Sequence, residues 1–131
     1  MKSKISIAFL LLLLSGCSSV ALTHDEVVKA DFGQYPENYK SIVKNWFEEL
    51  LKDPESARYK FDNKPIKAYT RNPPVEGGGV VHFGYYVKVK VNAKNSFGGY
   101  TGWQEYRLLI RNGKVIDNFI ANMYFKEPWY Q

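Results

Sequence analysis

Apolar residues between positions 39 and 51 recur at steps of three and four, and these steps trace one face of an amphipathic helix. Charged and amide side chains occupy the opposite face. The pattern stops at Asp53-Pro54, because the proline ring clashes with the preceding turn and moves Asp53 out of helical geometry. The sequence therefore predicts one helix that lies on a sheet, with an apolar face made of Tyr39, Ile42, Val43, Trp46, Phe47, Leu50 and Leu51.

Beyond this helix the period becomes that of β-strands. Short aromatic and β-branched runs at 59–61 and 66–70 are typical of strands or of a sheet edge. Residues 72–79 contain two prolines and three glycines and are predicted to form a loop. The strand that follows, 80–93, shows the clearest alternation, with Val87, Val89 and Val91 on one face and Tyr86, Lys88 and Lys90 on the other.

A second alternating run covers 104–111, and Asn112-Gly113 after it is a strong signal for a two-residue hairpin turn. A third long strand, 114–123, is expected to return from that turn, and Pro128 limits the aromatic tail to a sheet edge. We therefore predict an α+β domain in which the helix covers one face of a meander of about four antiparallel strands. A strongly curved half-barrel closed by the helix is the alternative.

The N-terminus has the organisation of a bacterial export signal. A positive region with Lys2 and Lys4 is followed by an uncharged apolar run at 5–14. That run is shorter than the roughly 20 apolar residues that span a membrane, so a signal peptide fits better than a transmembrane anchor. An ordinary signal peptide cut at another position is the remaining alternative.

The apolar run closes with Leu14-Ser15-Gly16-Cys17, which resembles the lipobox of bacterial lipoproteins. The resemblance implies that Cys17 carries a lipid and that residues 1–16 are removed as a signal peptide. We expect residues 17–33 to contain the lipidated cysteine and a flexible tether. Residues 34–131 then form one periplasmic α+β domain.

Cys17 is the one cysteine of the chain, so no disulfide forms within it and thiolate metal sites are excluded. The formal charge of +5 falls to +3 when Lys2 and Lys4 leave with the signal peptide. Basic residues are scattered along the chain and export removes the protein from nucleic acid, so we expect no nucleic-acid partner. The lysines are interpreted as a solvated surface, with anionic envelope surfaces as the alternative.

The segment 92–103, between two of the predicted strands, carries the residues that we select as a candidate binding site. Its amide, hydroxyl and aromatic side chains are suited to stacking on a sugar ring or holding a peptide. A structural role is the alternative, because asparagines bond nearby backbone, glycines permit tight turns and aromatic rings fill the end of a sheet. The selected residues are Asn92, Asn95, Ser96, Phe97, Tyr100 and Trp103.

Two motifs, DPESAR at 53–58 and VNAKNSFGGYTG at 91–102, resemble those of a group of small, largely uncharacterised bacterial envelope lipoproteins. The resemblance extends over most of residues 32–113. It implies a shared domain and an envelope location. It does not indicate any activity or identify catalytic residues. Ser18, directly after the lipidated cysteine, implies sorting to the outer membrane, facing the periplasm, rather than to the inner membrane.

The sequence holds few residues suited to catalysis. His24 falls in the tether and His82 lies in an alternating strand, so the two do not form a metal-ligand pair. Ser96 lacks the Gly-x-Ser-x-Gly elbow of a hydrolase, and the glycines at 77–79 are not followed by the residues of a phosphate loop. We therefore predict no enzyme activity, no cofactor and no metal.

Our leading hypothesis is a lipid-anchored binding or adaptor domain that contacts an envelope protein or peptidoglycan through a sheet edge or the 92–103 segment. The alternative is an inhibitor or accessory of a peptidoglycan hydrolase, in which that segment enters the cleft of the enzyme. A third hypothesis is hydrolysis by the protein itself, which requires a pocket that brings His82 together with a carboxylate and a hydroxyl.

Overall fold

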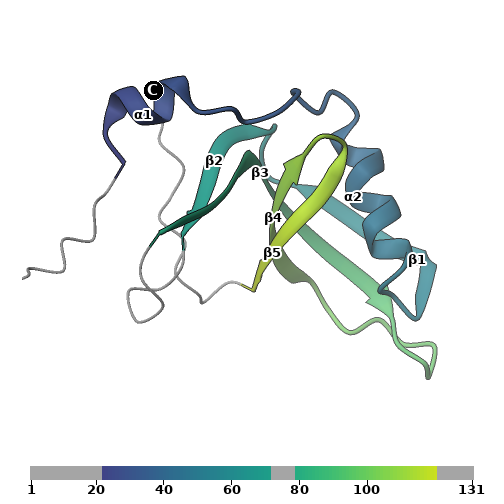
Figure 1. The fold of residues 1–131 in the computed structure, drawn as a ribbon. Helices are drawn as coiled ribbons and strands as arrows, with labels where there is room; N and C mark the ends of the chain where they lie inside the picture. The colour runs from purple at the N-terminus through teal and green to yellow at the C-terminus, as the bar shows by residue number, and fades with distance from the viewer. Residues whose placement is uncertain (1–21, 72–78, 121–131) are drawn as a thin grey trace, which may run out of the picture.

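A computed structural model of the protein describes residues 22–71 and 79–120, and it shows a small α+β fold with two short helices and a five-stranded antiparallel sheet (Figure 1). The α+β class predicted from the sequence is confirmed. The predicted signal peptide, Cys17, residues 72–78 and the tail after residue 120 lie outside the described residues. Within the described ranges, neither helix has the length and apolar character needed to cross a membrane.

The long strand β3 (Val80–Lys94) forms the centre of the sheet. On one flank it pairs along its C-terminal half with β1 (Asp53–Phe61) and along its N-terminal half with β2 (Ile66–Arg71). On the other flank it pairs with β4 (Gln104–Arg111), and β5 (Lys114–Ile120) follows beyond β4. The sheet has five strands rather than the predicted four or so, because the first flank is divided between β1 and β2, which both pair with β3; from β2 to β5, consecutive strands are neighbours as in a meander.

The gap between β1 and β2 is closed by the side chain of Asn63. Its Oδ1 accepts a hydrogen bond from the backbone N–H of Lys88 at 2.7 Å, and its Nδ2 donates to the carbonyl oxygen of Tyr86 at 3.2 Å. The N–H of Asp62 donates to the carbonyl oxygen of Lys88. An amide side chain thus replaces backbone pairing, so that β3 keeps its partners where the flank is interrupted.

The helix α2 (Tyr39–Glu48) covers the sheet face that carries Val87 and Val89 of β3. Both valines are fully buried, whereas Lys88 between them is only partly buried, which confirms the alternation predicted for this strand. The main core lies between the helix and the sheet and consists of Ile42, Val43, Phe47, Val87, Val89, Val91, Leu108 and Ile110.

The helix ends earlier than the sequence predicted. Glu48 is its last residue, and the backbone N–H groups of Leu50 and Leu51 both bond to the carbonyl oxygen of Phe47. This closing turn takes Leu50 off the apolar face, where we had placed it, and leaves it 57% exposed. Leu51 still packs against the core.

The strand β1 is longer than the predicted run, because it begins at Asp53 and includes Pro54. It is an edge strand, where the missing N–H of a proline interrupts no interior ladder of hydrogen bonds. Its register with β3 shifts between Asp53 and Arg58. The proline that ended the helical pattern therefore starts the sheet.

The second face of the sheet has a smaller core of its own. Ala68, Tyr86 and Leu109 are buried there, and Ile116 packs against them. The sequence predicted a helix over one face only, and it placed Lys88 and Lys90 beside Tyr86 on the second face. Periodicity along single strands does not show that Tyr86 and Leu109 lie opposite each other in the β3–β4 ladder.

The hairpin predicted at Asn112-Gly113 is confirmed. Both residues have positive φ, at 49° and 78°, as a two-residue turn of the primed type requires. The turn joins β4 to β5, and β5 is described as far as Ile120. The remaining predicted strand residues, 121–123, lie outside the described residues.

Part of the segment that we interpreted as a tether forms the short helix α1 (His24–Lys29). Thr23 and Glu26 form a capping box, in which the Thr23 side chain accepts from the N–H of Glu26 and the Glu26 carboxylate accepts from the N–H of Thr23. The sequence shows no lasting period here, because the helix is too short to repeat a face.

The residues after α1 are fixed to the sheet by Arg111. Its guanidinium donates to the carbonyl oxygens of Asp31 and Phe83 and, at 2.8 Å, to the Asp31 carboxylate. The N–H of Gly33, followed by the charge of Arg111, holds the pKa of Asp31 below its usual value. Phe32 is 4% exposed, with its ring edge-on to Phe83. The place where the chain enters the domain is therefore set by specific contacts.

Candidate functional site

The two motifs quoted above meet at one end of the sheet. The N–H of Lys94 donates to Oγ of Ser56 at 2.9 Å, and the hydroxyl of Tyr100 donates to the carbonyl oxygen of Ser56 at 3.1 Å. Oγ of Ser56 also donates to the carbonyl oxygen of Asp53 at 2.8 Å. Ser56 therefore joins the irregular start of β1 to the end of β3 and to the loop that follows it.

That loop, residues 95–103, is referred to here as the β3–β4 loop, and its backbone is held by two asparagines. Oδ1 of Asn95 accepts from the N–H groups of Phe97 and Gly99, and Oδ1 of Asn92 accepts from the N–H of Gly102 at 3.1 Å. Gly102 has a φ of 97°, which disfavours any side chain at this position. The carbonyl oxygens of both asparagines thus have the structural role that we gave as the alternative.

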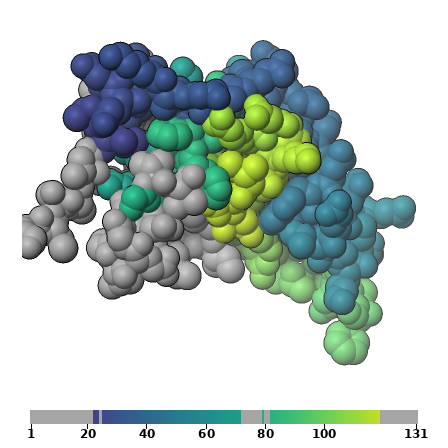
Figure 2. Space-filling model, in the orientation of Figure 1, coloured from purple at the N-terminus to yellow at the C-terminus, as the bar shows by residue number. Residues whose placement is uncertain are grey.

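The aromatic side chains of the loop are presented to solvent rather than folded under it. Phe97 is 96% exposed, and Tyr100 and Trp103 are 40% and 42% exposed. Ser96 is also exposed. Figure 2 shows the loop protruding from the body of the molecule. A fixed backbone therefore displays an apolar ring that makes little contact with its own domain.

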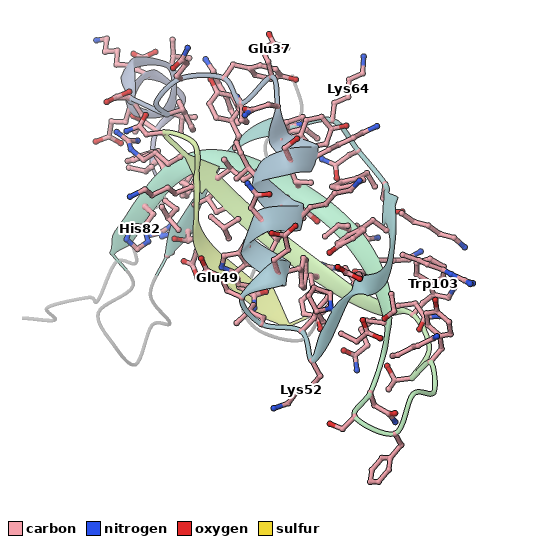
Figure 3. All side chains as sticks on the ribbon, turned by 90° about the vertical axis from the view of Figure 1, so that its right-hand side faces the viewer. Glu37, Glu49, Lys52, Lys64, His82 and Trp103 are labelled. Atoms are coloured by element: carbon pink, nitrogen blue, oxygen red, sulfur yellow. The ribbon has the colours of Figure 1, made fainter. Side chains whose placement is uncertain are left out.

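Three cations gather over the exposed rings. The guanidinium carbon of Arg58 lies 4.4 Å from the centre of the Tyr100 ring, and Nζ of Lys94 lies 5.5 Å from it. Nζ of Lys60 lies 4.2 Å from the centre of the Trp103 ring. Figure 3 shows Trp103 beside the edge of the sheet, at the end where the loop projects. We call Arg58, Lys60, Lys94, Tyr100 and Trp103 the cation–aromatic patch.

The patch follows from strand geometry. Arg58 and Lys60 occupy alternate positions on β1 and pair with Asn92 and Lys90 of β3, so both side chains point to the sheet face opposite α2. Basic residues that are scattered in sequence are thereby brought together in space. The alternation of positions 58 and 60 was the available signal, but the short run from which we predicted this strand began after Arg58.

Carboxylates neutralise the neighbouring lysines but not the patch. Lys88 is within ion-pair distance of Asp62 and Glu105, and Lys90 is within ion-pair distance of Asp62. The hydrogen bond from Lys88 to Glu105 raises the pKa of Lys88. Burial would raise the pKa of Glu105, but the hydrogen bonds and the charges of Lys88 and Arg107 together lower it.

Among residues 22–71 and 79–120, by contrast, no carboxylate lies within ion-pair distance of Arg58, Lys60 or Lys94. Each of these three charges lies instead over the ring of Tyr100 or Trp103. The patch is therefore an electropositive surface, and it lies beside the ion pairs of Lys88 and Lys90 with Asp62 and Glu105.

His82 is exposed rather than buried, and its Nδ1 lies 3.6 Å from Oδ2 of Asp117. Thr70 pairs with His82 across β2 and β3, but its buried Oγ1 makes no hydrogen bond, so the hydroxyl is not linked to the imidazole. Among the described residues, Thr70 therefore does not form the hydrogen-bonded pair of nucleophile and base that covalent catalysis uses. In the part of the chain that the structure describes, no group of three or more His, Cys, Asp or Glu could hold a metal.

Comparison of this chain with protein-family models, with curated proteins and with solved structures finds no match. The site is therefore interpreted from its own geometry. That geometry consists of a fixed loop with an exposed apolar tip, together with an adjoining electropositive patch.

Proposed function

We propose that the protein is an outer-membrane lipoprotein, anchored through lipid at Cys17, whose periplasmic domain binds another envelope component through the β3–β4 loop and the cation–aromatic patch. The observation that carries the proposal is the loop itself, where hydrogen bonds to Asn92 and Asn95 hold the backbone while Phe97 is 96% exposed. Exposed aromatic residues beside unneutralised cations are typical of recognition surfaces. The domain acts as an adaptor and not as an enzyme.

The position of the anchor supports the choice of surface. Figures 1 and 3 place α1 and the β3–β4 loop at opposite ends of the molecule. Cys17 precedes the first described residue, Leu22, by a short stretch that reaches at most about 18 Å when fully extended. Arg111 fixes the chain just after α1. A membrane that holds the lipid therefore lies near α1, and the loop points away from it.

Affinity capture from crosslinked envelopes tests the proposal. Phe97→Ser removes the exposed ring from the loop, and we expect recovery of the captured component to fall at least about tenfold, because aromatic anchors dominate interface energies. Leu50→Ser is the matched control, since Leu50 is an exposed apolar residue outside the loop, and its recovery should equal that of the wild type. Equal recovery by all three proteins would show that the loop is not part of the binding surface.

Inhibition or support of a peptidoglycan hydrolase is a second candidate, favoured by the protruding apolar tip at Phe97. A single projecting ring is suited to entering the cleft of an enzyme. The same capture experiment decides between the candidates. A hydrolase recovered with the wild type and with Leu50→Ser, but not with Phe97→Ser, would support this second function.

A further inference from the structure

We propose that the cation–aromatic patch binds the carboxylates of peptidoglycan, so that the protein links its membrane to the cell wall. The inference rests on the proposed function, and it specifies the class of ligand at the same surface. It depends on the geometry of Arg58, on the spacing of the three cations and on the direction in which the patch faces.

Arg58 is held in an arrangement suited to an oxyanion. Its guanidinium lies over the ring of Tyr100, and the hydroxyl of Tyr100 is bonded to the carbonyl oxygen of Ser56, so the ring itself is fixed. A guanidinium that stacks on a ring keeps its N–H donors at its edge, where they match the two oxygens of a carboxylate or a phosphate. The cation is thus oriented before a ligand arrives.

The cations are spaced for a polymer with repeated negative charges. Arg58 and Lys60 are two residues apart on one strand face, which separates them by roughly 7 Å along β1. Lys94 shares the Tyr100 ring with Arg58, so the three charges lie together at the end of the sheet that carries the loop. Exposed portions of Tyr100 and Trp103 offer ring surface to the sugars of such a polymer.

Carboxylates of the cell wall fit the position of these charges better than phosphates of a membrane. The patch adjoins the β3–β4 loop, which lies at the end of the molecule opposite α1 (Figures 1 and 3). Lipid phosphates gather at the anchoring membrane. The carboxylate-bearing peptides of peptidoglycan lie in the space that the loop faces.

Cosedimentation with purified peptidoglycan sacculi tests the inference. The mature lipidated protein, held in neutral detergent, should pellet with sacculi, and added salt should weaken the binding. Arg58→Gln combined with Lys60→Gln should weaken it about tenfold or more. The matched control is Lys40→Gln combined with Lys44→Gln, which removes the same charge from lysines that lie over rings on the α2 side of β1. That control should bind as the wild type does.

Two further arms identify the oxyanion. Sacculi whose carboxylates have been amidated should lose most of the binding, and phosphatidylglycerol vesicles should bind weakly and show no dependence on Arg58 and Lys60. Equal weakening by both double variants would show a general charge effect and overturn the inference. Undiminished binding to amidated sacculi, or vesicle binding that requires Arg58 and Lys60, would also overturn it. Circular dichroism of each variant should show the spectrum of the wild type, which checks that the fold is retained.

The inference can fail without the proposed function failing. If the wild type does not pellet with sacculi while capture from envelopes still depends on Phe97, the ligand is not peptidoglycan but the loop remains the binding surface. If neither experiment shows dependence on its residues, both the inference and the proposed function are wrong.

Discussion

The Cys17→Ser protein is expected to incorporate no fatty-acid label, and either to remain as the uncut precursor or to be released as an unlipidated domain. Lipidation of a lipobox cysteine forms a thioether between its sulfur and a diacylglyceryl group, and the hydroxyl of serine is a much weaker nucleophile. The substitution preserves side-chain size and the apolar run before it. A single acyl chain binds membranes only marginally, whereas two chains give stable anchoring, so loss of the group should change the location of the protein completely.

Labelling cells with a fatty-acid probe, followed by fractionation, measures this effect. Ser19→Ala is the matched control, because it changes a nearby polar residue and leaves the sulfur in place. The wild type and the control should carry label in the outer-membrane fraction. Label on the Cys17→Ser protein, or a soluble wild type, would contradict the anchored orientation on which the proposed function depends.

Phe47→Ala is expected to lower the free energy of unfolding by about 3–5 kcal/mol. Phe47 is 1% exposed, and its ring lies against Trp46, Tyr59 and Tyr106 at centroid distances of 4.9, 5.8 and 4.8 Å. Truncation therefore leaves a cavity at the contact between α2 and the sheet. Small domains have a total stability of about 5–15 kcal/mol, so this one change removes a large part of it.

Urea unfolding of the purified mature protein, followed by circular dichroism, gives the free-energy difference. Leu50→Ala is the control, because Leu50 is 57% exposed in the turn after α2 and its truncation should change stability by less than about 0.5 kcal/mol. A similar loss in both variants would show that α2 does not contribute the main core in the way described. So would a loss below about 1 kcal/mol for Phe47→Ala.

Elements with a sustained period could be predicted from the sequence. The valines at alternate positions of β3 and the apolar steps of α2 each repeat several times, so each pattern indicates both an element and its buried face. Asn112-Gly113 was sufficient for the hairpin, because few residue pairs accept two positive φ angles. These local signals were consistent with one another and indicated the α+β class.

Features that depend on distant contacts could not be predicted. The start of β1 relies on Ser56, whose hydroxyl oxygen accepts from Lys94, and the division of the first flank relies on Asn63. Neither contact leaves a periodic trace in the sequence. For helix α1, the spacing of Thr23 and Glu26 was the available signal in the sequence. A capping box that is not followed by an apolar period is weak evidence for a helix.

The candidate site was predicted in part. The sequence predicted a candidate binding site in the β3–β4 loop. Phe97, Tyr100 and Trp103 are exposed in that loop, as a binding role requires. The oxygens of Asn92 and Asn95 proved to be used by the loop backbone. The cations over the rings were missed, because Arg58 reaches Tyr100 only through the pairing of β1 with β3.

Site-specific photocrosslinking in living cells tests most directly whether the β3–β4 loop is the binding surface of an anchored domain. A photoreactive amino acid is placed at Phe97, and in separate proteins at Leu50 and Val28, which are also exposed apolar positions. We expect a defined adduct with a non-lipid envelope component from position 97, and none of that adduct from positions 50 and 28. Lipid adducts from position 97, or the same adduct from all three positions, would contradict it.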